Sequence, residues 1–89
     1  MKKKRTVTLK NKLGLHARAA AKIVNVSSRY GSEVFLEKDG RKVNGRSILG
    51  ILTLACPIGS LITVEADGLD AKDVIRELVE LVENKFGEE

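Results

Sequence analysis

Alternation of apolar and polar residues predicts four short strands in this chain. They are expected at residues 6–9, 33–38, 41–44 and 61–66. In the last of these segments Ile62, Val64 and Ala66 fall on one face, and polar residues separate them. Asp39-Gly40 lies between the second and third segments and is a two-residue turn signal, so these two strands are expected to form a hairpin.

Apolar residues recur at helical spacing in two longer segments. Residues 17–29 are rich in alanine, and Tyr30-Gly31 supplies a stop signal for a helix there. The last helix begins after Asp70, which is expected to cap it, and Gly87 is expected to end it. The expected apolar positions are Ala17, Ala20, Ala21 and Val24 in the first helix and Val74, Ile75, Leu78, Leu81, Val82 and Phe86 in the last.

Residues 47–54 are ambiguous, because their closely spaced isoleucines and leucines suit a short buried helix or a buried strand. Ser47 is a favoured N-cap residue and favours the helix. The element order is then strand, helix, strand, strand, helix, strand, helix. This order predicts an α+β open-faced β-sandwich, with a four-stranded antiparallel sheet and three helices on one side. A chain of 89 residues suits one domain over residues 1–89.

Composition excludes several classes of protein. The longest apolar runs are broken by glycine, threonine or charge, which argues against membrane insertion. The basic residues 1–5 precede a polar strand rather than an apolar signal core, so we expect a cytoplasmic protein. Cys56 is the single cysteine and is expected to be a small buried hydrophobe. The sequence has no cysteine and histidine cluster, so no metal site or cofactor is expected.

The net charge of +4 raises the question of nucleic-acid binding. The three aromatic residues, Tyr30, Phe35 and Phe86, are scattered and form no stacking platform. We therefore interpret the basic N-terminal run as a solvated tail. The basic surface suits an acidic protein partner better than a nucleic acid, because opposite charges steer encounters between proteins.

His16 is the only histidine and directly precedes the first expected helix. Backbone N–H groups without partners and the positive end of the helix dipole create an anion site there. A neutral imidazole has a nucleophilic lone pair and could accept a phosphoryl group at this position. The Ala17 and Arg18 N–H groups would face the new charge, and the Arg18 guanidinium suits phosphate oxygens. From the residues alone, a surface histidine or a simple cap stays open as the alternative.

Two motifs carry a resemblance to a known family. Gly14-Leu15-His16-Ala17-Arg18-Ala19-Ala20, followed by Gly45-Arg46-Ser47-Ile48-Leu49-Gly50-Ile51-Leu52, resembles the HPr family of the bacterial phosphoenolpyruvate-dependent sugar phosphotransferase system. The likeness extends over residues 5–86 and implies the HPr-like βαββαβα fold. Many members have proline where this chain has Ala19, and we expect a softer first helical turn without loss of chemistry.

The resemblance implies a phosphocarrier without enzymatic turnover of its own. His16 is expected to accept a phosphoryl group on Nδ1 from enzyme I, which phosphoenolpyruvate charges, and to pass it to a sugar-specific enzyme IIA. Gly14, Ala17 and Arg18 are the expected phosphate-binding residues. A monomer is the expected state.

A second set of residues is expected to serve regulation and docking. In many family members the serine matching Ser47 is phosphorylated by HPr kinase/phosphorylase, which inhibits phosphorylation of the histidine by enzyme I. Leu49, Leu52 and Arg46 are expected at the partner-facing patch. The competing interpretations are an N-cap role for Ser47 and burial of one or both leucines.

Two other functions remain open within the family. A nitrogen-related phosphotransferase branch uses phosphoryl transfer for regulation rather than sugar uptake. A regulatory binding module acts without transfer, as in relatives that lack the histidine. The presence of His16 argues against the second function.

Overall fold

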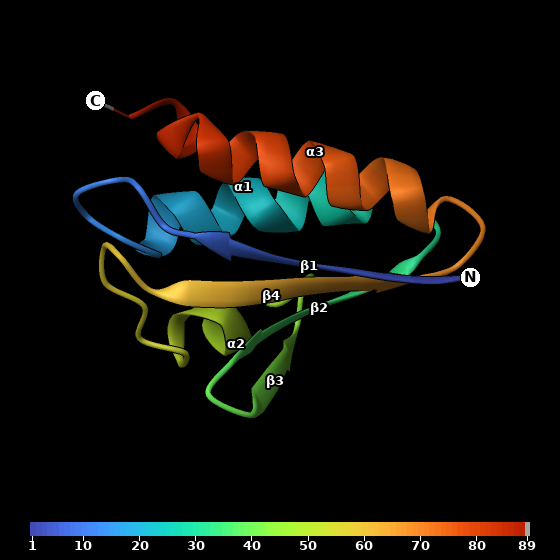
Figure 1. Ribbon diagram of the computed structural model, residues 1–89, viewed down its shortest axis with the longest axis horizontal. Helices are drawn as coiled ribbons and strands as arrows, with labels where there is room; N and C mark the ends of the chain where they lie inside the picture. Colours follow the sequence, from blue (N-terminus) through green and yellow to red (C-terminus); the bar gives the residue numbers. More distant parts are fainter. Residues whose placement is uncertain (89) are drawn as a thin grey trace.

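A computed structural model describes residues 1–88 and contains one four-stranded sheet covered by helices (Figure 1). The strands are antiparallel and lie in the order β1-β4-β2-β3. This arrangement confirms the predicted α+β open-faced sandwich. The elements are β1 (Lys2–Thr8), α1 (Ala17–Ser28), β2 (Glu33–Lys38), β3 (Arg41–Asn44), α2 (Ile48–Leu52), β4 (Leu61–Asp67), α3 (Ala71–Glu83) and the 3-10 turn η1 (Lys85–Gly87).

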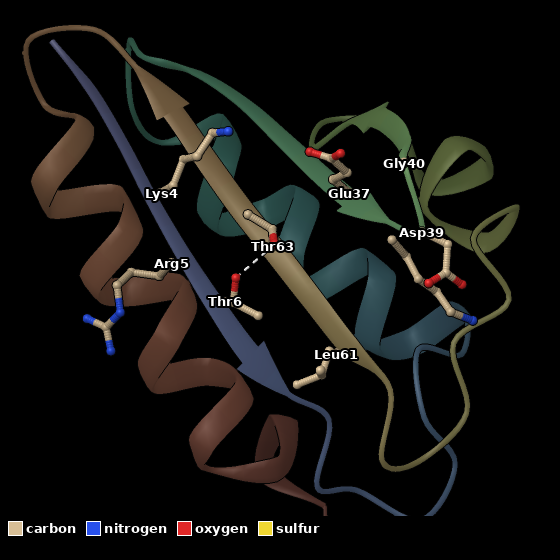
Figure 2. Close-up of a pocket in the computed structure, with 9 residues that line it drawn as sticks. Lys4, Arg5, Thr6, Glu37, Asp39, Gly40, Leu61 and Thr63 are labelled. Carbon is tan, nitrogen blue, oxygen red and sulfur yellow. Dashed lines mark hydrogen bonds between the residues drawn. The ribbon is translucent and has the colours of Figure 1, made fainter.

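The core lies between the sheet and its helices because apolar residues alternate along the strands. The most buried strand residues, at 0–1% exposure, are Leu36, Ile62, Val64 and Ala66. Ile51 of α2 and Leu78 of α3 pack into the same cluster. The other face of the sheet is open and polar. Figure 2 shows a hydrogen bond of 2.9 Å across this face between the hydroxyls of Thr6 and Thr63.

Helix α1 is rotated relative to its expected orientation. The expected apolar positions Ala17 and Ala21 are exposed, whereas Ile23 and Val26 are buried. The larger branched side chains remove more apolar surface from water than alanines do, which favours the observed rotation. Ala20 is buried as expected.

The basic N-terminal run is part of β1 and is not the solvated tail that we expected. The strand begins at Lys2 instead of Thr6 and pairs with β4 over its whole length. The ammonium groups of Lys2 and Lys4 lie 3.7 Å from the carboxylate of Glu65, whose residue is 3% exposed. Burial raises the pKa of Glu65, but Lys42, Lys2 and Lys4 outweigh burial and leave this pKa lowered. Pairing with β4 therefore orders the run.

Residues 48–52 form a helix rather than a strand. The Gly50 N–H donates to the Ser47 hydroxyl at 3.0 Å, which confirms the predicted N-cap. Ile51 enters the core with no exposed surface, so a single residue anchors α2 fully. Cys56 follows α2 and is 5% exposed, and burial raises the pKa of its thiol. This confirms that Cys56 is a buried hydrophobe.

Helix α3 differs from its prediction at both ends. Asp70 stands at the N-cap position, but its carboxylate makes no capping bond to its own helix. It accepts from the Gly31 and Ser32 N–H groups at 2.9 Å each, and so holds the loop between α1 and β2. The helix ends at Glu83 instead of Gly87, because the backbone becomes left-handed at Lys85, with φ 56°.

Candidate functional site

A tight loop places His16 at the start of α1. Gly14 has φ +64°, and a Cβ there would lie 2.3 Å from the Cys56 carbonyl oxygen, so the loop requires glycine. The next residue, Leu15, is buried and donates its N–H to the same oxygen at 2.8 Å. The Gly14 N–H donates to the Asn11 carbonyl at 3.1 Å. Gly14 therefore shapes the loop.

The N-terminus of α1 keeps its backbone donors available. The first hydrogen bond of the helix runs from the Ala20 N–H to the His16 carbonyl at 2.9 Å. The N–H groups of residues 17–19 precede this bond and have no acceptor within the helix. His16 is the N-cap residue, but its side chain makes no capping bond. The structure thus brings an imidazole and an open helix terminus together, which is a suitable arrangement for an anion.

The His16 ring contacts a carboxylate from the far end of the chain. Nε2 of His16 hydrogen-bonds Oε2 of Glu88, and the two side chains are 25% and 18% exposed. An ionised carboxylate accepts hydrogen bonds and donates none, so Nε2 carries the hydrogen. In the neutral ring Nδ1 then has the free lone pair. The contact therefore distinguishes the two ring nitrogens.

Asn11 holds the Glu88 carboxylate in place. Its side chain is fully buried, and its Nδ2 donates to the Gly14 carbonyl at 2.7 Å and to Oε1 of Glu88 at 3.0 Å. The hydrogen bond from His16 lowers the pKa of Glu88, and the bond from Asn11 lowers it further. Glu88 is therefore ionised at neutral pH, and Asn11 connects it to the loop before α1.

A left-handed turn brings Glu88 to His16. Lys85, Phe86 and Gly87 have φ values of 56°, 56° and 76°. Phe86 is fully buried, and Lys22 of α1 donates to its carbonyl oxygen. Non-glycine residues adopt this region infrequently, so burial and the Lys22 bond hold the turn. Sequence analysis missed Asn11, Lys22 and Glu88, and it placed Phe86 among the apolar positions of the last helix rather than in a turn beyond it.

Arg18 lies at the second position of α1, next to His16. It is exposed, and within residues 1–88 its side chain makes no hydrogen bond or ion pair. A cation at a helix N-terminus is unfavourable unless an anion is present. Its free guanidinium fork suits the oxygens of a phosphoryl group.

Among residues 1–88, no group of three or more histidine, cysteine, aspartate or glutamate side chains is placed to hold a metal ion.

The other expected residues gather around α2, which contacts α1. Leu49 is 78% exposed, whereas Leu52 is half-buried against the core. Arg46 is committed to the backbone: its guanidinium donates to the carbonyls of Ser27 at 3.3 Å, Tyr30 at 2.6 Å and Ser32 at 3.1 Å. These bonds tie the residue before Ser47 to the end of α1.

Leu13 adds an apolar surface that sequence analysis missed. It lies in the loop before His16 and is 69% exposed. Single exposed leucines are common on protein surfaces, so one alone gives little indication of a binding site. Leu13 and Leu49 are two exposed leucines on segments next to α1, and both are candidate docking residues.

None of the described helices is both long enough and apolar enough to cross a membrane.

Comparisons with known proteins give the family of this chain and proteins of similar sequence and fold. Residues 3–84 match the family model described as the PTS HPr component phosphorylation site. The phosphocarrier protein HPr of Cupriavidus necator is 44% identical over 84 residues, which cover 94% of each chain. A crystal structure of HPr from Thermoanaerobacter tengcongensis superposes with a TM-score of 0.94 at 46% identity and covers 98% of both chains.

One similar structure belongs to a differently named relative. The crystal structure of Crh, a catabolite repression protein of Bacillus subtilis, has a TM-score of 0.76 at 42% identity and covers 89% of this chain and 91% of its own. It is described as an intertwined, swapped dimer. The family model covers most of the chain, and the HPr proteins of Cupriavidus necator and Thermoanaerobacter tengcongensis exceed 40% identity over nearly their full lengths. This chain therefore belongs to the HPr family of phosphocarrier proteins of the phosphotransferase system.

Proposed function

We propose that His16 accepts a phosphoryl group on Nδ1 from enzyme I and passes it to a sugar-specific enzyme IIA. One observation carries this proposal: His16 stands at the open N-terminus of α1 with its Nε2 held by Glu88. Membership of the HPr family supports the same function. Phosphoenolpyruvate charges enzyme I, and the chain itself needs no cofactor.

The transfer step moves one phosphoryl group between two nucleophiles. The Nδ1 lone pair of His16 attacks phosphorus, and the bond from phosphorus to its donor on enzyme I breaks. The ring keeps its hydrogen on Nε2 and becomes cationic, so the Glu88 carboxylate faces a positive ring. The phosphoryl oxygens lie near the N–H groups that begin α1 and near Arg18. Attack by enzyme IIA reverses these changes at His16.

Phosphoryl donation requires that the site does not bind the group too strongly. An exposed helix terminus stabilises an anion by about 0.3–1 kcal/mol. A factor of ten in equilibrium requires about 1.4 kcal/mol, so this contribution leaves transfer reversible. Arg18 is exposed to solvent, and it adds a contact that can be released.

We place the docking surface for enzyme I and enzyme IIA around Leu13 and Leu49. Leu13 and Leu49 lie in the loop before α1 and in α2, which flank the first helix. Leu52 contributes from a half-buried position. Arg46 acts indirectly in this proposal, because its bonds to three carbonyls fix the segment that leads into α2.

Phosphorylation of Ser47 by HPr kinase/phosphorylase is the proposed regulation of docking. The Ser47 hydroxyl now accepts from the Gly50 N–H, and a phosphoryl group would add about −1.5 to −2 charges beside Leu49. A helix N-terminus tolerates negative charge, so the fold would persist. The added charge would oppose binding of an acidic or apolar partner surface.

A cytoplasmic monomer is the proposed state. The swapped Crh dimer makes the oligomeric state a quantity to measure by sedimentation. A regulatory binding module is the second candidate function, because the Crh structure shares the fold at 42% identity. A nitrogen-related relay would use the same chemistry at His16 and would differ in its partners.

The intact mass after incubation with phosphoenolpyruvate and a cognate enzyme I tests the proposal. We expect one acid-labile phosphoryl group on the wild-type protein and none on His16→Ala. No gain of mass with an enzyme I that phosphorylates a second HPr would contradict phosphoryl transfer. It would also favour the regulatory module.

A further inference from the structure

The outer edge of β1 presents free backbone groups. β1 lies at one end of the sheet and pairs only with β4 among the described elements. The Met1 carbonyl accepts from the Gly68 N–H at 2.8 Å, and the Leu9 N–H donates to the Ser60 carbonyl at 2.9 Å. Bonding alternates along an antiparallel strand, so odd-numbered residues bond toward β4. The N–H and C=O groups of Lys2, Lys4, Thr6 and Thr8 therefore point outward.

A groove with an apolar floor runs beside this edge. It has a volume of about 410 Å³ and lies between β1 and α3. Ile75 and Val79 of α3 form its apolar part. Figure 2 shows Arg5 pointing from β1 toward α3, whereas Lys4 lies on the open face of the sheet. The edge is thus bordered by side chains from both faces.

Positive charge surrounds the groove. Lys3, Arg5 and Lys72 line it and are exposed. Within the described part of the chain these three cations form no ion pair. Arg76 also lines the groove, with Asp73 3.3 Å away, and Glu80 is the single acidic lining residue. The groove therefore has an excess of cations that the fold does not use.

We propose that this edge binds an extended acidic segment of a partner protein, which adds a fifth strand beside β1. Addition of a strand satisfies the outward backbone groups, and alternate side chains of the segment reach the groove. Acidic residues on the segment pair with the free cations, and its apolar residues cover Ile75 and Val79. Net positive charge at the edge selects the acidic segment.

A second copy of this chain fits the edge less well. Antiparallel pairing of two β1 strands over Lys2–Thr8 would place Arg5 opposite Arg5 of the copy and bring together the four cations at residues 2–5 of each strand. Like charges at paired positions destabilise a sheet, and lysines on an edge strand oppose this kind of self-association. An acidic strand meets no such repulsion.

The proposed surface is separate from His16. The groove is lined by residues of β1 and by residues of α3 from Lys72 to Glu80, and neither His16 nor Glu88 lines it. Phosphoryl acceptance by His16 is thus expected to proceed while the groove is occupied.

The first test is fluorescence anisotropy with a labelled eight-residue peptide, Glu-Thr-Val-Thr-Glu-Thr-Val-Thr, which places its glutamates and valines on the same face of a strand. We expect Lys3→Glu to weaken binding about fivefold, because one attractive contact becomes repulsive. Arg41→Glu is the matched control, since Arg41 is also an exposed strand cation and lies on β3, away from the groove. Equal losses for the two variants would overturn the proposed location.

A second peptide separates strand addition from charge attraction. N-methylation of its alternate amides removes the donors needed for pairing and keeps the charge. We expect this peptide to bind at least tenfold more weakly, and the parent peptide to shift the NMR signals of the Lys2, Lys4 and Thr6 amides. Equal binding of the methylated peptide would contradict strand addition. Tighter binding of a labelled oligouridine, or self-association of the wild type through β1, would overturn the proposed partner.

Discussion

The N-termini of α1 and α2 contain related parts and are used differently. Ser47 at α2 closes its own helix, because its hydroxyl accepts from the Gly50 N–H at 3.0 Å. His16 at α1 leaves the helix open and directs its ring to Glu88. The hydroxyl supplies local stability, whereas the imidazole leaves backbone donors free for a ligand. A residue at an N-cap position whose side chain does not cap its own helix is thus available for another role.

The third N-terminus extends this comparison. Asp70 stands at the start of α3 but binds the loop between α1 and β2. Its contacts are tertiary, so it stabilises the arrangement of two segments rather than one helix. The three positions therefore serve ligand binding, local capping and loop attachment.

Removal of the Arg18 guanidinium should have the largest effect on phosphoryl acceptance, because it changes the open N-terminus of α1 and leaves the rest of the fold intact. We expect Arg18→Ala to slow phosphoryl acceptance about 10- to 100-fold, since a hydrogen bond to a charged group contributes about 1.5–3 kcal/mol. The melting temperature should not change, because the side chain is exposed. Quench-flow kinetics with phosphorylated enzyme I measures the rate.

Arg18→Lys is the matched control for that experiment. It keeps the charge and loses the planar fork, so an intermediate rate is expected. Transfer by Arg18→Ala at the wild-type rate would remove Arg18 from the site.

Two substitutions at Ser47 separate capping from regulation. Ser47→Ala should cost about 1 kcal/mol of unfolding free energy and lower the melting temperature by about 4–8 °C, with normal phosphoryl acceptance. Ser47→Asp keeps a capping oxygen and adds charge, so it should retain stability and slow acceptance from enzyme I. Thermal unfolding and the same kinetic assay measure both effects. Normal acceptance by Ser47→Asp would count against the regulatory role.

Substitution of Asp70 should give the smallest effect, a loss of thermal stability at pH 7 that disappears at low pH. The Ser32 hydroxyl and then the Gly31 N–H hold the pKa of Asp70 below its usual range. The ionised form therefore stabilises the fold above the unfolded pKa of about 3.9, and this contribution is lost as the pH falls through the lower folded pKa. Asp70→Asn should melt earlier at pH 7 and approach the wild type at low pH. Parallel melting profiles from pH 7 to pH 2.5 would refute this role.

Local patterns predicted much of the fold and part of the site. The alternation of β2 and β4, the Asp39-Gly40 turn and the Ser47 cap each depend on neighbouring residues, and each is present in the structure. The N-terminal half of β1 was missed because its order comes from β4, more than 50 residues later.

The partners of His16 were beyond the reach of local patterns. Glu88 lies 72 residues from His16, and the contact depends on successive left-handed residues that no periodicity signals. Asn11 was classed with the loop because a buried amide and an exposed amide look alike in a sequence. The nucleophile could thus be predicted, while the groups that orient it required the tertiary structure.

The nitrogen of His16 that carries the phosphoryl group tests the central claim most directly. Labelling the histidine with ¹⁵N and measuring phosphorus–nitrogen and proton–nitrogen couplings identifies this atom in the phosphorylated protein. The account predicts phosphorus on Nδ1 and a hydrogen on Nε2 that faces Glu88, with Glu88→Ala losing the protected Nε2 proton signal. Phosphorus on Nε2, or on no nitrogen of His16, would contradict the account.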